Sequence, residues 1–577
     1  MRLRTDYTVG EIPHAEHPMP QHMRKAWCCL NGMWLLRKYT VNGTENFSGK
    51  ILVPFSPETL LSGLEEGFAL GVGERLEYER TFSLTSAELK NRVILHFGAV
   101  DSECAVFVNG RKVGGHRGGF TSFSMEITDQ VVAGENTLVV SVQDEATRNG
   151  GARGKQSDHA GGIWYTPQSG IWQTVWLEFK PERSIENLRI TPCLAEKKLV
   201  VEFACEDAVE IVVSDNGKEL LRAKGRERVE FVYDFSLWSP ENPKLYDLLL
   251  ISEGGDELSS YFGFRSFGIV TDKKGKKRLA LNGKPYFYNG VLDQGYWSDG
   301  LLTYPSDQSA IDELKMLKEM GFNTVRKHIK VEPMRWYYHC DRLGLVVWQD
   351  FVNGGGEYKF SHVALLPFLG FRHKDNDYRY FAREDETARR EFFEMAQEIV
   401  SSLYNCVSVG VYVPFNEGWG QFDSAEITRW IETIDPTRIV DSVSGWHDQG
   451  EKETRLKSLH TYYTPLKVPK DARAVVLSEF GGYAMKVDGH VFNPKKEFGY
   501  KKFRSQETLC MAMEKLYLRK LLPLLSKGLS AAIYTQVSDV EEEINGLVTF
   551  DRKIQKIPTQ KMRAWNEKLQ REWEKID

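Results

Sequence analysis

The chain has 577 residues, which is more than one hydrophobic core organises, so we expect about three domains. Hydrophobic residues make up 41% and charged residues 27%, and no stretch approaches the ~18 apolar residues of a membrane helix, so a soluble protein without a membrane partner is expected. The net charge of -5 and the lack of any Lys/Arg block argue against nucleic acid as a partner.

The N-terminal residues and the cysteines predict the compartment. Charges and prolines interrupt residues 1–27, where a signal peptide has a continuous apolar segment, so secretion by that route is not expected. The eight cysteines form no CxxC pair and no Cys/His ligand spacing, so neither disulfides nor a structural zinc site is expected. These features predict reduced thiols and a cytoplasmic location.

Residues 50–180 contain short strands separated by turn residues. Val93, Leu95 and Phe97 alternate with other residues in one such strand. A period of two is typical of half-buried strands in an all-β sandwich. The first domain, residues 1–181, is therefore predicted to be a β-sandwich.

A second β block follows at residues 182–271. It includes the segments "KKLVVEFAC" and "VEIVVSDNGKELL". Its length of about 90 residues and its strand spacing of about 8 to 12 residues are typical of an immunoglobulin-like sandwich.

The periodicity changes in residues 272–577. The segment "DQSAIDELKMLKEMG" places Ile311, Leu314, Leu317 and Met320 on one helical face and ends with a glycine, a common residue just past a helix end. Strand-like and helical segments then alternate, with close to eight strand starts. This pattern predicts a C-terminal (β/α)8 TIM barrel.

One connection in the predicted barrel is unusually long. Residues 353–385 are rich in aromatic residues and glycine. Long loops in compact domains are often functional, so we expect this one to form a wall of the active site.

Two glutamates stand at the carboxyl ends of predicted barrel strands, where active sites of this fold lie. Glu417 follows the apolar run "VYVPF" and Glu479 follows "AVVL", and each is close to glycine. Two facing carboxylates suit glycoside hydrolysis, in which one protonates the leaving oxygen and the other attacks the sugar. The competing interpretation is that each pairs with a neighbouring Arg or caps the next helix.

Ordered motifs along the whole chain resemble glycoside hydrolase family 2, which contains β-galactosidases, β-glucuronidases and β-mannosidases. The motifs are "GIWYTPQSGIWQTVWLE", "LWSPENPKLY", "NGKPYFYNGV", "FNTVRKH", "VVWQDF", "FNEGWGQF" and "LSEFGG". The resemblance implies a sugar-binding jelly-roll domain, an immunoglobulin-like sandwich and a catalytic TIM barrel.

The resemblance also implies roles for individual residues. Glu417 would be the acid/base and Glu479 the nucleophile, while Asn416 would bind the 2-hydroxyl of the sugar. Tyr462 resembles the tyrosine that orients the nucleophile, with Tyr463 as the competing assignment. Arg326 resembles an arginine that keeps the nucleophile ionised, although a surface ion pair is the alternative.

Further candidates for binding or supporting roles lie at other strand ends and among the aromatic residues. For Asp293, Gln294 and Asp350, helix capping is an equal alternative. The role of His328 is open because its spacing departs from the galactosidase pattern. The complete set of these candidates is His328, Asp293, Gln294, Asp350, Trp419, Trp446, His460 and Tyr534.

The resemblance favours an exo-acting retaining β-glycosidase, with β-D-galactosides as the first choice of substrate and uronic acid glycosides as the alternative. Asn493 and Lys495 match the Asn-x-Lys spacing of β-glucuronidases but not its usual setting. No magnesium ligands are recognisable, so we expect no metal and no cofactor. Association into a homo-oligomer is expected. The competing class is a carbohydrate-binding protein on a degenerate hydrolase scaffold.

Overall fold

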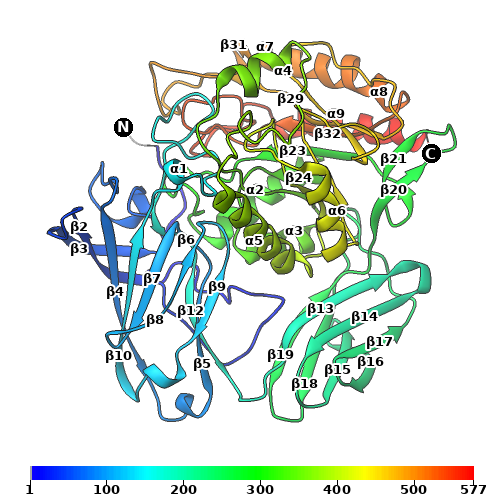
Figure 1. Cartoon of the computed structure of the whole chain (residues 1–577). Helices are drawn as coiled ribbons and strands as arrows, with labels where there is room; N and C mark the ends of the chain where they lie inside the picture. The colour runs from blue at the N-terminus through cyan, green and yellow to red at the C-terminus, as the bar shows by residue number, and fades with distance from the viewer. Residues whose placement is uncertain (1–2, 577) are drawn as a thin grey trace.

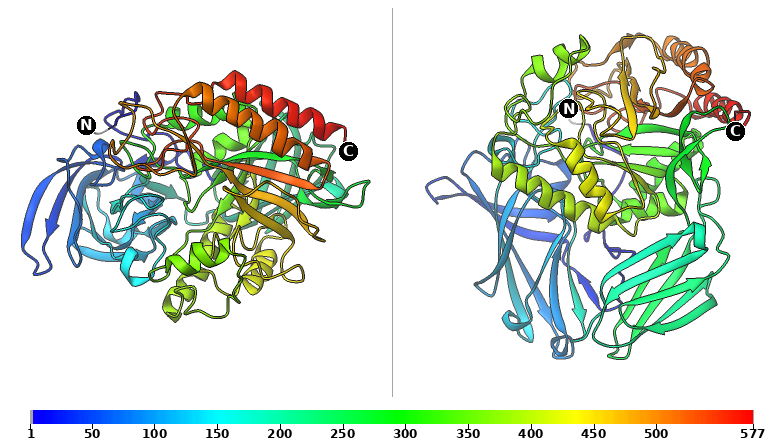
Figure 2. Two further views of the ribbon diagram at one scale, coloured as in Figure 1. Left: turned by 90° about the horizontal axis from the view of Figure 1, so that it is seen from above. Right: turned by 45° about the vertical axis from the view of Figure 1, so that its right-hand side comes forward.

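The computed structural model describes residues 3–576, apart from the side chains of residues 146 and 149, and it contains two β-sandwiches and a barrel (Figure 1). The sandwiches, coloured blue to blue-green, lie side by side below the barrel, coloured green to red, and Figure 2 shows the same arrangement from another side. The predicted fold class is confirmed. The domain boundaries after residues 181 and 271 stay predictions.

The first sandwich has a six-stranded sheet of order β3-β2-β4-β10-β7-β8 and a four-stranded sheet of order β1-β12-β5-β9. Alternate residues of β10 point inward, so Leu138, Val140 and Val142 are buried while their neighbours are partly exposed. The strands are β1 (Trp27–Cys29), β2 (Gly32–Tyr39), β3 (Glu45–Val53), β4 (Arg75–Leu84), β5 (Arg92–Phe97), β6 (Val100–Asp101), β7 (Glu103–Val108), β8 (Arg111–Arg117), β9 (Phe123–Glu126), β10 (Gly134–Gln143), β11 (Gly170–Ile171) and β12 (Val175–Lys180). Short helices are η1 (Leu60–Ser62), η2 (Glu88–Lys90), η3 (Thr128–Gln130) and α1 (Ala146–Asn149).

The second sandwich packs the sheet β13-β14-β17 against the sheet β16-β15-β18-β19. Seven antiparallel strands in two sheets match the immunoglobulin-like prediction. The strands are β13 (Glu186–Cys193), β14 (Lys198–Ala204), β15 (Val209–Asp215), β16 (Lys218–Gly225), β17 (Arg228–Val232), β18 (Tyr246–Ser252) and β19 (Glu257–Phe262), with η4 (Leu194–Glu196) between the first two.

The barrel is built from parallel strands in the order β27-β26-β25-β24-β23-β32-β29-β28. Most of their residues are buried, as in parallel strands covered on both faces. The strands are β23 (Tyr288–Asp293), β24 (Thr324–Lys327), β25 (Val346–Asp350), β26 (Val409–Val413), β27 (Ile439–Val440), β28 (Leu456–Thr461), β29 (Ala474–Gly481) and β32 (Leu529–Thr535).

Helices cover the barrel, and the first of them forms for local reasons. Ser306 caps α2 by accepting a hydrogen bond from the backbone amide of Ser309, and Leu314 and Leu317 are buried on its inner face. Gly321 follows with a φ of +83°, as predicted. The helices are α2 (Asp307–Glu319), α3 (Met334–Leu343), η5 (Ser361–Leu365), α4 (Leu366–Phe368), α5 (Glu386–Leu403), α6 (Ser424–Ile434), α7 (Gln506–Glu514), η6 (Lys515–Leu521), α8 (Leu522–Leu525) and α9 (Thr559–Glu574).

Small sheets flank the barrel strands. The flanking strands are β20 (Phe267–Thr271), β21 (Lys277–Leu281), β22 (Lys284–Pro285), β30 (Tyr483–Met485) and β31 (Lys501–Phe503). Within residues 3–576, none of the helices combines the length and apolar character needed to span a membrane. The cytoplasmic location stays a prediction.

Candidate active site

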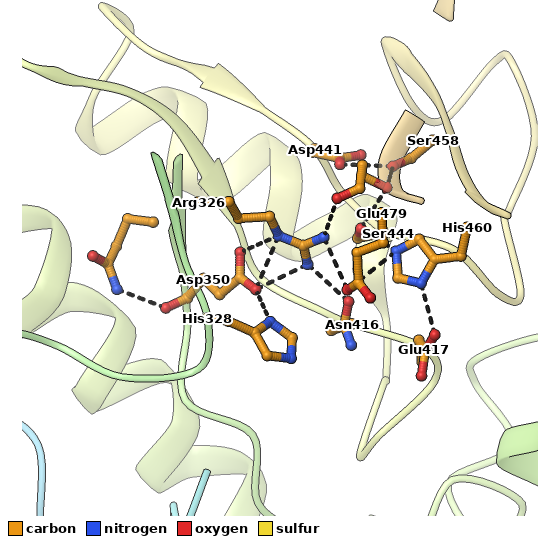
Figure 3. Close-up of polar contacts among 12 residues, drawn as sticks. Arg326, His328, Asp350, Asn416, Glu417, Asp441, Ser444, Ser458, His460 and Glu479 are labelled. Atoms are coloured by element: carbon orange, nitrogen blue, oxygen red, sulfur yellow. Dashed lines mark hydrogen bonds and ion pairs between the residues drawn. The ribbon is translucent and has the colours of Figure 1, made fainter. Parts of the chain in front are cut away.

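Glu417 and Glu479 meet at the mouth of the barrel. Glu417 follows β26 and Glu479 lies near the end of β29, and the carboxyl ends of parallel strands open on the same face. One carboxylate oxygen of each lies within 4.8 Å of the other, and His460 of β28 lies within the same distance of both (Figure 3). The structure therefore brings the two predicted carboxylates together.

The ring of His460 connects the two carboxylates. Its Nδ1 lies 2.7 Å from Oε1 of Glu417, and its Nε2 lies 2.9 Å from the Ser444 hydroxyl and 3.5 Å from Oε1 of Glu479 (Figure 3). The side chain is fully buried. His460 thus fixes the position of the Glu417 carboxylate relative to Glu479.

The segment around Glu417 depends on its two glycines. Glu417 has a φ of 50°, a left-handed conformation that non-glycine residues adopt rarely, often at functional sites. Gly418 and Gly420 also have positive φ, and a Cβ at Gly420 would lie 2.1 Å from the backbone oxygen of Gly354. These glycines therefore allow close packing against the long loop as well as turning the chain, and Trp419 between them is buried.

Glu479 is held at both carboxylate oxygens. Arg326 Nη1 donates to Oε1 at 3.1 Å, and the Tyr462 hydroxyl donates to Oε2. Burial alone would raise the pKa of Glu479, but His460, Arg326 and the Tyr462 hydrogen bond hold it below its ordinary value. The surroundings of this carboxylate therefore favour its ionised form.

Arg326 is completely buried and joins several site residues. Its Nε and Nη2 each donate to an oxygen of Asp350 at 2.9 Å, and Nη2 also donates to Oδ1 of Asn416 at 2.7 Å (Figure 3). A surface ion pair, the alternative for this arginine, is wrong because no part of the side chain reaches solvent. Asp350 is the buried ion-pair partner of Arg326.

Asn416 keeps one donor free. Its Oδ1 is occupied by Arg326, whereas its buried Nδ2 has no hydrogen-bond partner among the described residues. An unmatched buried donor is costly, so a ligand that accepts from it would gain binding energy.

His328 lies on the other side of Asp350. Its Nδ1 is 2.6 Å from Oδ2 of Asp350. Burial, followed by the nearby charge of Lys155, holds the pKa of His328 well below its ordinary range, so the ring is neutral. A neutral ring that donates from Nδ1 leaves Nε2 as an acceptor.

Of the two neighbouring tyrosines, only Tyr462 reaches the nucleophile candidate. Its ring stacks on Tyr500 with 3.7 Å between centroids, and its hydroxyl also lies 3.2 Å from that of Thr535. Tyr463 is 66% exposed. The geometry therefore supports the assignment to Tyr462.

A small cavity lies over the carboxylate pair. Its walls come from the barrel and also from the first sandwich. The lining residues are Lys155, Ile163, Leu292, Gln294, His328, Glu417, Trp419, Tyr462, Glu479, Tyr500, Thr535 and Glu543.

Several of these residues were not predicted from the sequence. Lys155 and Ile163 belong to the first sandwich, and Tyr500, Thr535 and Glu543 follow the last barrel strands or end one. Ile163 lies in the Gly-rich aromatic segment "GGIWYTPQSGIW", and Lys155 precedes it. This segment was the only feature of the sequence that indicated a functional role for the loop.

Asp293 and Tyr534 do not line the cavity, and their polar atoms are engaged elsewhere. Oδ2 of Asp293 forms a buried ion pair with Nζ of Lys327 at 2.5 Å, and Oδ1 accepts a hydrogen bond from the backbone amide of Gly295 in a turn. Both oxygens are therefore engaged. Tyr534 is 1% exposed and its hydroxyl accepts from the Tyr483 amide. The prediction that these two residues contact the sugar is therefore wrong. Asp293 is held by an ion pair and a turn, and Tyr534 is packed in the core.

The remaining predictions on aromatic residues are only partly matched. Trp446 is not among the lining residues of the cavity, and its ring centroid lies 5.6 Å from that of His460 and 4.9 Å from that of Phe368. The long loop, residues 353–385, contributes no residue of the described structure to the lining of the cavity. It instead holds the segment after Glu417, since Arg383 donates to the Gly420 carbonyl at 2.8 Å.

The group Glu417, His460 and Glu479 also has the donor spacing of a metal site. Arg326 places a positive guanidinium on the same Glu479 oxygen, and His460 is already bonded to Glu417. A second cation at this point would meet electrostatic repulsion, so we assign no metal to the group.

Three family-domain models match this chain, and together they cover most of it. They are the "Glycosyl hydrolases family 2, sugar binding domain" at residues 65–181, "Glycosyl hydrolases family 2" at residues 185–265, and the "Glycosyl hydrolases family 2, TIM barrel domain" at residues 273–486. The chain belongs to glycoside hydrolase family 2.

Individual relatives carry two different names. A putative β-glucuronidase of Formosa agariphila is 29% identical over 473 residues, covering 72% of this chain and 51% of that protein. A β-galactosidase of Alteromonas mediterranea is 28% identical over 404 residues, covering 64% of this chain and 35% of that protein. The chain thus spans about half or less of the length of these relatives.

Among solved structures, a β-glucuronidase from an uncultured Clostridium species has the same fold. The TM-score is 0.74 at 17% sequence identity, and the match covers 96% of this chain and 99% of that one. At this identity the likeness describes the fold.

Proposed function

We propose that the protein is an exo-acting retaining β-glycosidase that releases terminal β-linked sugars. The observation that carries this proposal is the distance within 4.8 Å between carboxylate oxygens of Glu417 and Glu479. Carboxyl groups about 5 to 5.5 Å apart are typical of retaining enzymes, whereas inverting enzymes need about 6.5 to 9.5 Å to admit a water molecule.

In the first step, Glu479 attacks the anomeric carbon and forms a covalent ester with the sugar. The bond between that carbon and the glycosidic oxygen breaks, and Glu417 gives its proton to the leaving oxygen. The surroundings that favour ionised Glu479 suit a nucleophile.

In the second step, Glu417 accepts a proton from water, and the water oxygen attacks the anomeric carbon. The ester bond to Glu479 breaks, which returns both carboxyl groups to their starting states. The bond from His460 to Glu417 would keep the acid/base in reach of the leaving oxygen throughout.

Asn416 would bind the 2-hydroxyl through its free Nδ2. Such a hydrogen bond strengthens as charge develops on the ring in the transition state. Arg326 would fix the amide orientation by occupying its oxygen.

The enclosure of the carboxylate pair supports exo action, since residues of the barrel and of the first sandwich together line the cavity around Glu417 and Glu479. The sequence-based choice of sugar is a β-D-galactoside, with a uronic acid glycoside as the alternative, and relatives with both kinds of name exist.

Hydrolysis of a panel of p-nitrophenyl β-glycosides tests the proposal. The panel should include the galactoside, glucoside, mannoside, glucuronide and galacturonide, with Glu479→Gln as the inactive control. We expect at least one sugar to be released with retained β configuration in the first product, as followed by NMR.

A non-catalytic carbohydrate-binding protein would give the opposite result. It would release none of the sugars, and Glu479→Ala would bind them as well as the unchanged protein. The two carboxylates, and the hydrogen bonds that hold them, favour an enzyme over a non-catalytic binding protein. A homo-oligomer stays a prediction for sedimentation analysis.

A further inference from the structure

One wall of the cavity comes from a loop of the first sandwich that is fixed to the barrel. The backbone amides of Arg153 and Gly154 donate to the carbonyl of Asn353 at 3.0 and 3.2 Å, and Arg153 Nη2 donates to the carbonyl of Gly356 at 2.9 Å. The following residue, Lys155, is thereby held at the barrel mouth and lines the cavity together with Glu479.

Lys155 is a largely buried residue that has no ion-pair partner among the described residues. The residue is 5% exposed, and no carboxylate oxygen of the described residues lies within 4.0 Å of its Nζ. Three aromatic rings surround it instead, with Nζ 4.8 Å from the centroid of Trp419, 5.7 Å from Tyr165 and 5.8 Å from Trp164. Aromatic faces hold a cation in place but leave its charge available to an anion.

The acidic neighbour in this part of the cavity is Glu543, and its oxygens are bonded elsewhere. Oε2 accepts from the Tyr165 hydroxyl and Oε1 accepts from Asn545 Nδ2 at 2.9 Å. Burial raises the pKa of Glu543, and the charge of Lys155 opposes that shift from a distance. Glu543 therefore does not neutralise Lys155 by direct contact.

The residues that match the β-glucuronidase spacing do not supply a cation here. The Asn493 side-chain oxygen accepts from the backbone amide of Lys495 at 3.0 Å, which makes a local turn, and Lys495 is exposed. An ammonium group that has no ion-pair partner and lines the cavity of the catalytic pair can bind an anionic ligand there.

We propose that Lys155 binds the carboxylate of a uronic acid at the non-reducing end of the substrate. The inference rests on the proposed glycosidase function and narrows its substrate class to β-D-uronides, either glucuronides or galacturonides. Lys155 is then a specificity-determining residue that the first sandwich contributes to the barrel site.

The first experiment uses the unchanged protein and needs no variant. Cleavage of p-nitrophenyl β-D-glucuronide and β-D-galacturonide is compared with that of their methyl esters and of the neutral glucoside and galactoside. We expect kcat/KM for at least one free acid to exceed that for its ester and its neutral counterpart by at least about 10-fold, because only the free acid can form an ion-paired hydrogen bond with Lys155.

The second experiment removes only the charge. Lys155→Met should lower kcat/KM for the free acid by about 100-fold while changing that for the methyl ester by less than about 3-fold. The exposed Lys112 of the same domain offers a matched control, and Lys112→Met should leave both values unchanged. Thermal unfolding of each variant checks that the domain contact persists.

The outcomes separate the two proposals. Preference for a neutral sugar, or an equal loss on acid and ester in Lys155→Met, overturns the role of Lys155 and leaves the glycosidase function intact. Release of no sugar at all overturns the proposed function, and the inference falls with it. A free-acid preference that disappears in Lys155→Met supports both.

Discussion

The two carboxylates of the site have very different surroundings. The Glu479 side chain is 6% exposed and has hydrogen-bond donors on both oxygens, whereas the Glu417 side chain is 14% exposed and contacts His460 through one oxygen. A fixed, ionised carboxylate suits attack on a single carbon, and a less restrained one suits repeated proton transfer. The difference in contacts between the two carboxylates therefore supports the proposed roles more directly than the position of either strand does.

The largest effect is expected at the more restrained carboxylate. Glu479→Gln keeps the size of the side chain but removes the nucleophile, so kcat/KM should fall by at least about 10⁴-fold for every active substrate. Trapping with a 2-deoxy-2-fluoro glycoside, followed by mass spectrometry, should label the unchanged protein and not the variant. Glu497→Gln, at an exposed position, is the control. Labelling at another residue would contradict the assignment.

Glu417→Ala should separate the two roles. The loss of the general acid should cost about 10³-fold on substrates with poor leaving groups and far less on dinitrophenyl glycosides, which depart without a proton. Azide should restore turnover of the activated substrate and give a β-glycosyl azide, because it attacks the glycosyl-enzyme without a general base. If azide neither accelerates turnover nor appears in the product, Glu417 is not the acid/base.

Arg326 tests whether the surroundings of Glu479 set its charge. Arg326→Lys keeps one charge but loses the forked contacts to Asp350 and Asn416, so we expect about a 100-fold loss in kcat/KM. Glu479 must be ionised to act as the nucleophile. Activity is therefore present above the pKa of Glu479 and is lost as the pH falls through that pKa. Because Arg326 lowers that pKa, the acidic limb of the pH profile should move to higher pH in the variant.

A structural defect alone would behave differently in Arg326→Lys. It would lower activity at all pH values without moving the acidic limb. The thermal unfolding of the variant should be measured together with the pH profile, since disrupting a buried ion pair can cost about 3 to 5 kcal/mol of stability.

Tyr462→Phe removes one hydrogen bond from the nucleophile. A hydrogen bond to a charged group contributes about 1.5 to 3 kcal/mol, so kcat/KM should fall by about 10- to 100-fold. The ring stacking on Tyr500 is retained, so the melting temperature should change little. An unchanged kcat/KM would show that Arg326 suffices to orient Glu479.

The sequence predicted the parts of this site that lie on barrel strands. Residues such as Glu417, Glu479 and Arg326 stand at or near the ends of strands with a clear apolar pattern, and a parallel barrel brings all strand ends to one face. Lys155 could not be predicted in this way, because its position depends on docking of the sandwich loop against Asn353. Asp293 was misjudged because the pairing partner Lys327 lies on the next strand, and strand register is set by tertiary packing.

The smallest effect is expected at the neighbour of Tyr462. Tyr463→Phe removes a hydroxyl from a side chain that is 66% exposed and that contacts Tyr500 and Phe368 only through its ring. Substitutions on the surface usually change free energies by less than about 0.5 kcal/mol, so kcat/KM should stay within about 2-fold of the unchanged protein. Measured beside Tyr462→Phe, this variant is a matched control, because both changes remove one phenolic oxygen from adjacent positions. A loss at residue 463 as large as that at residue 462 would mean that the chain turns differently after β28 and that Tyr463, not Tyr462, orients the nucleophile.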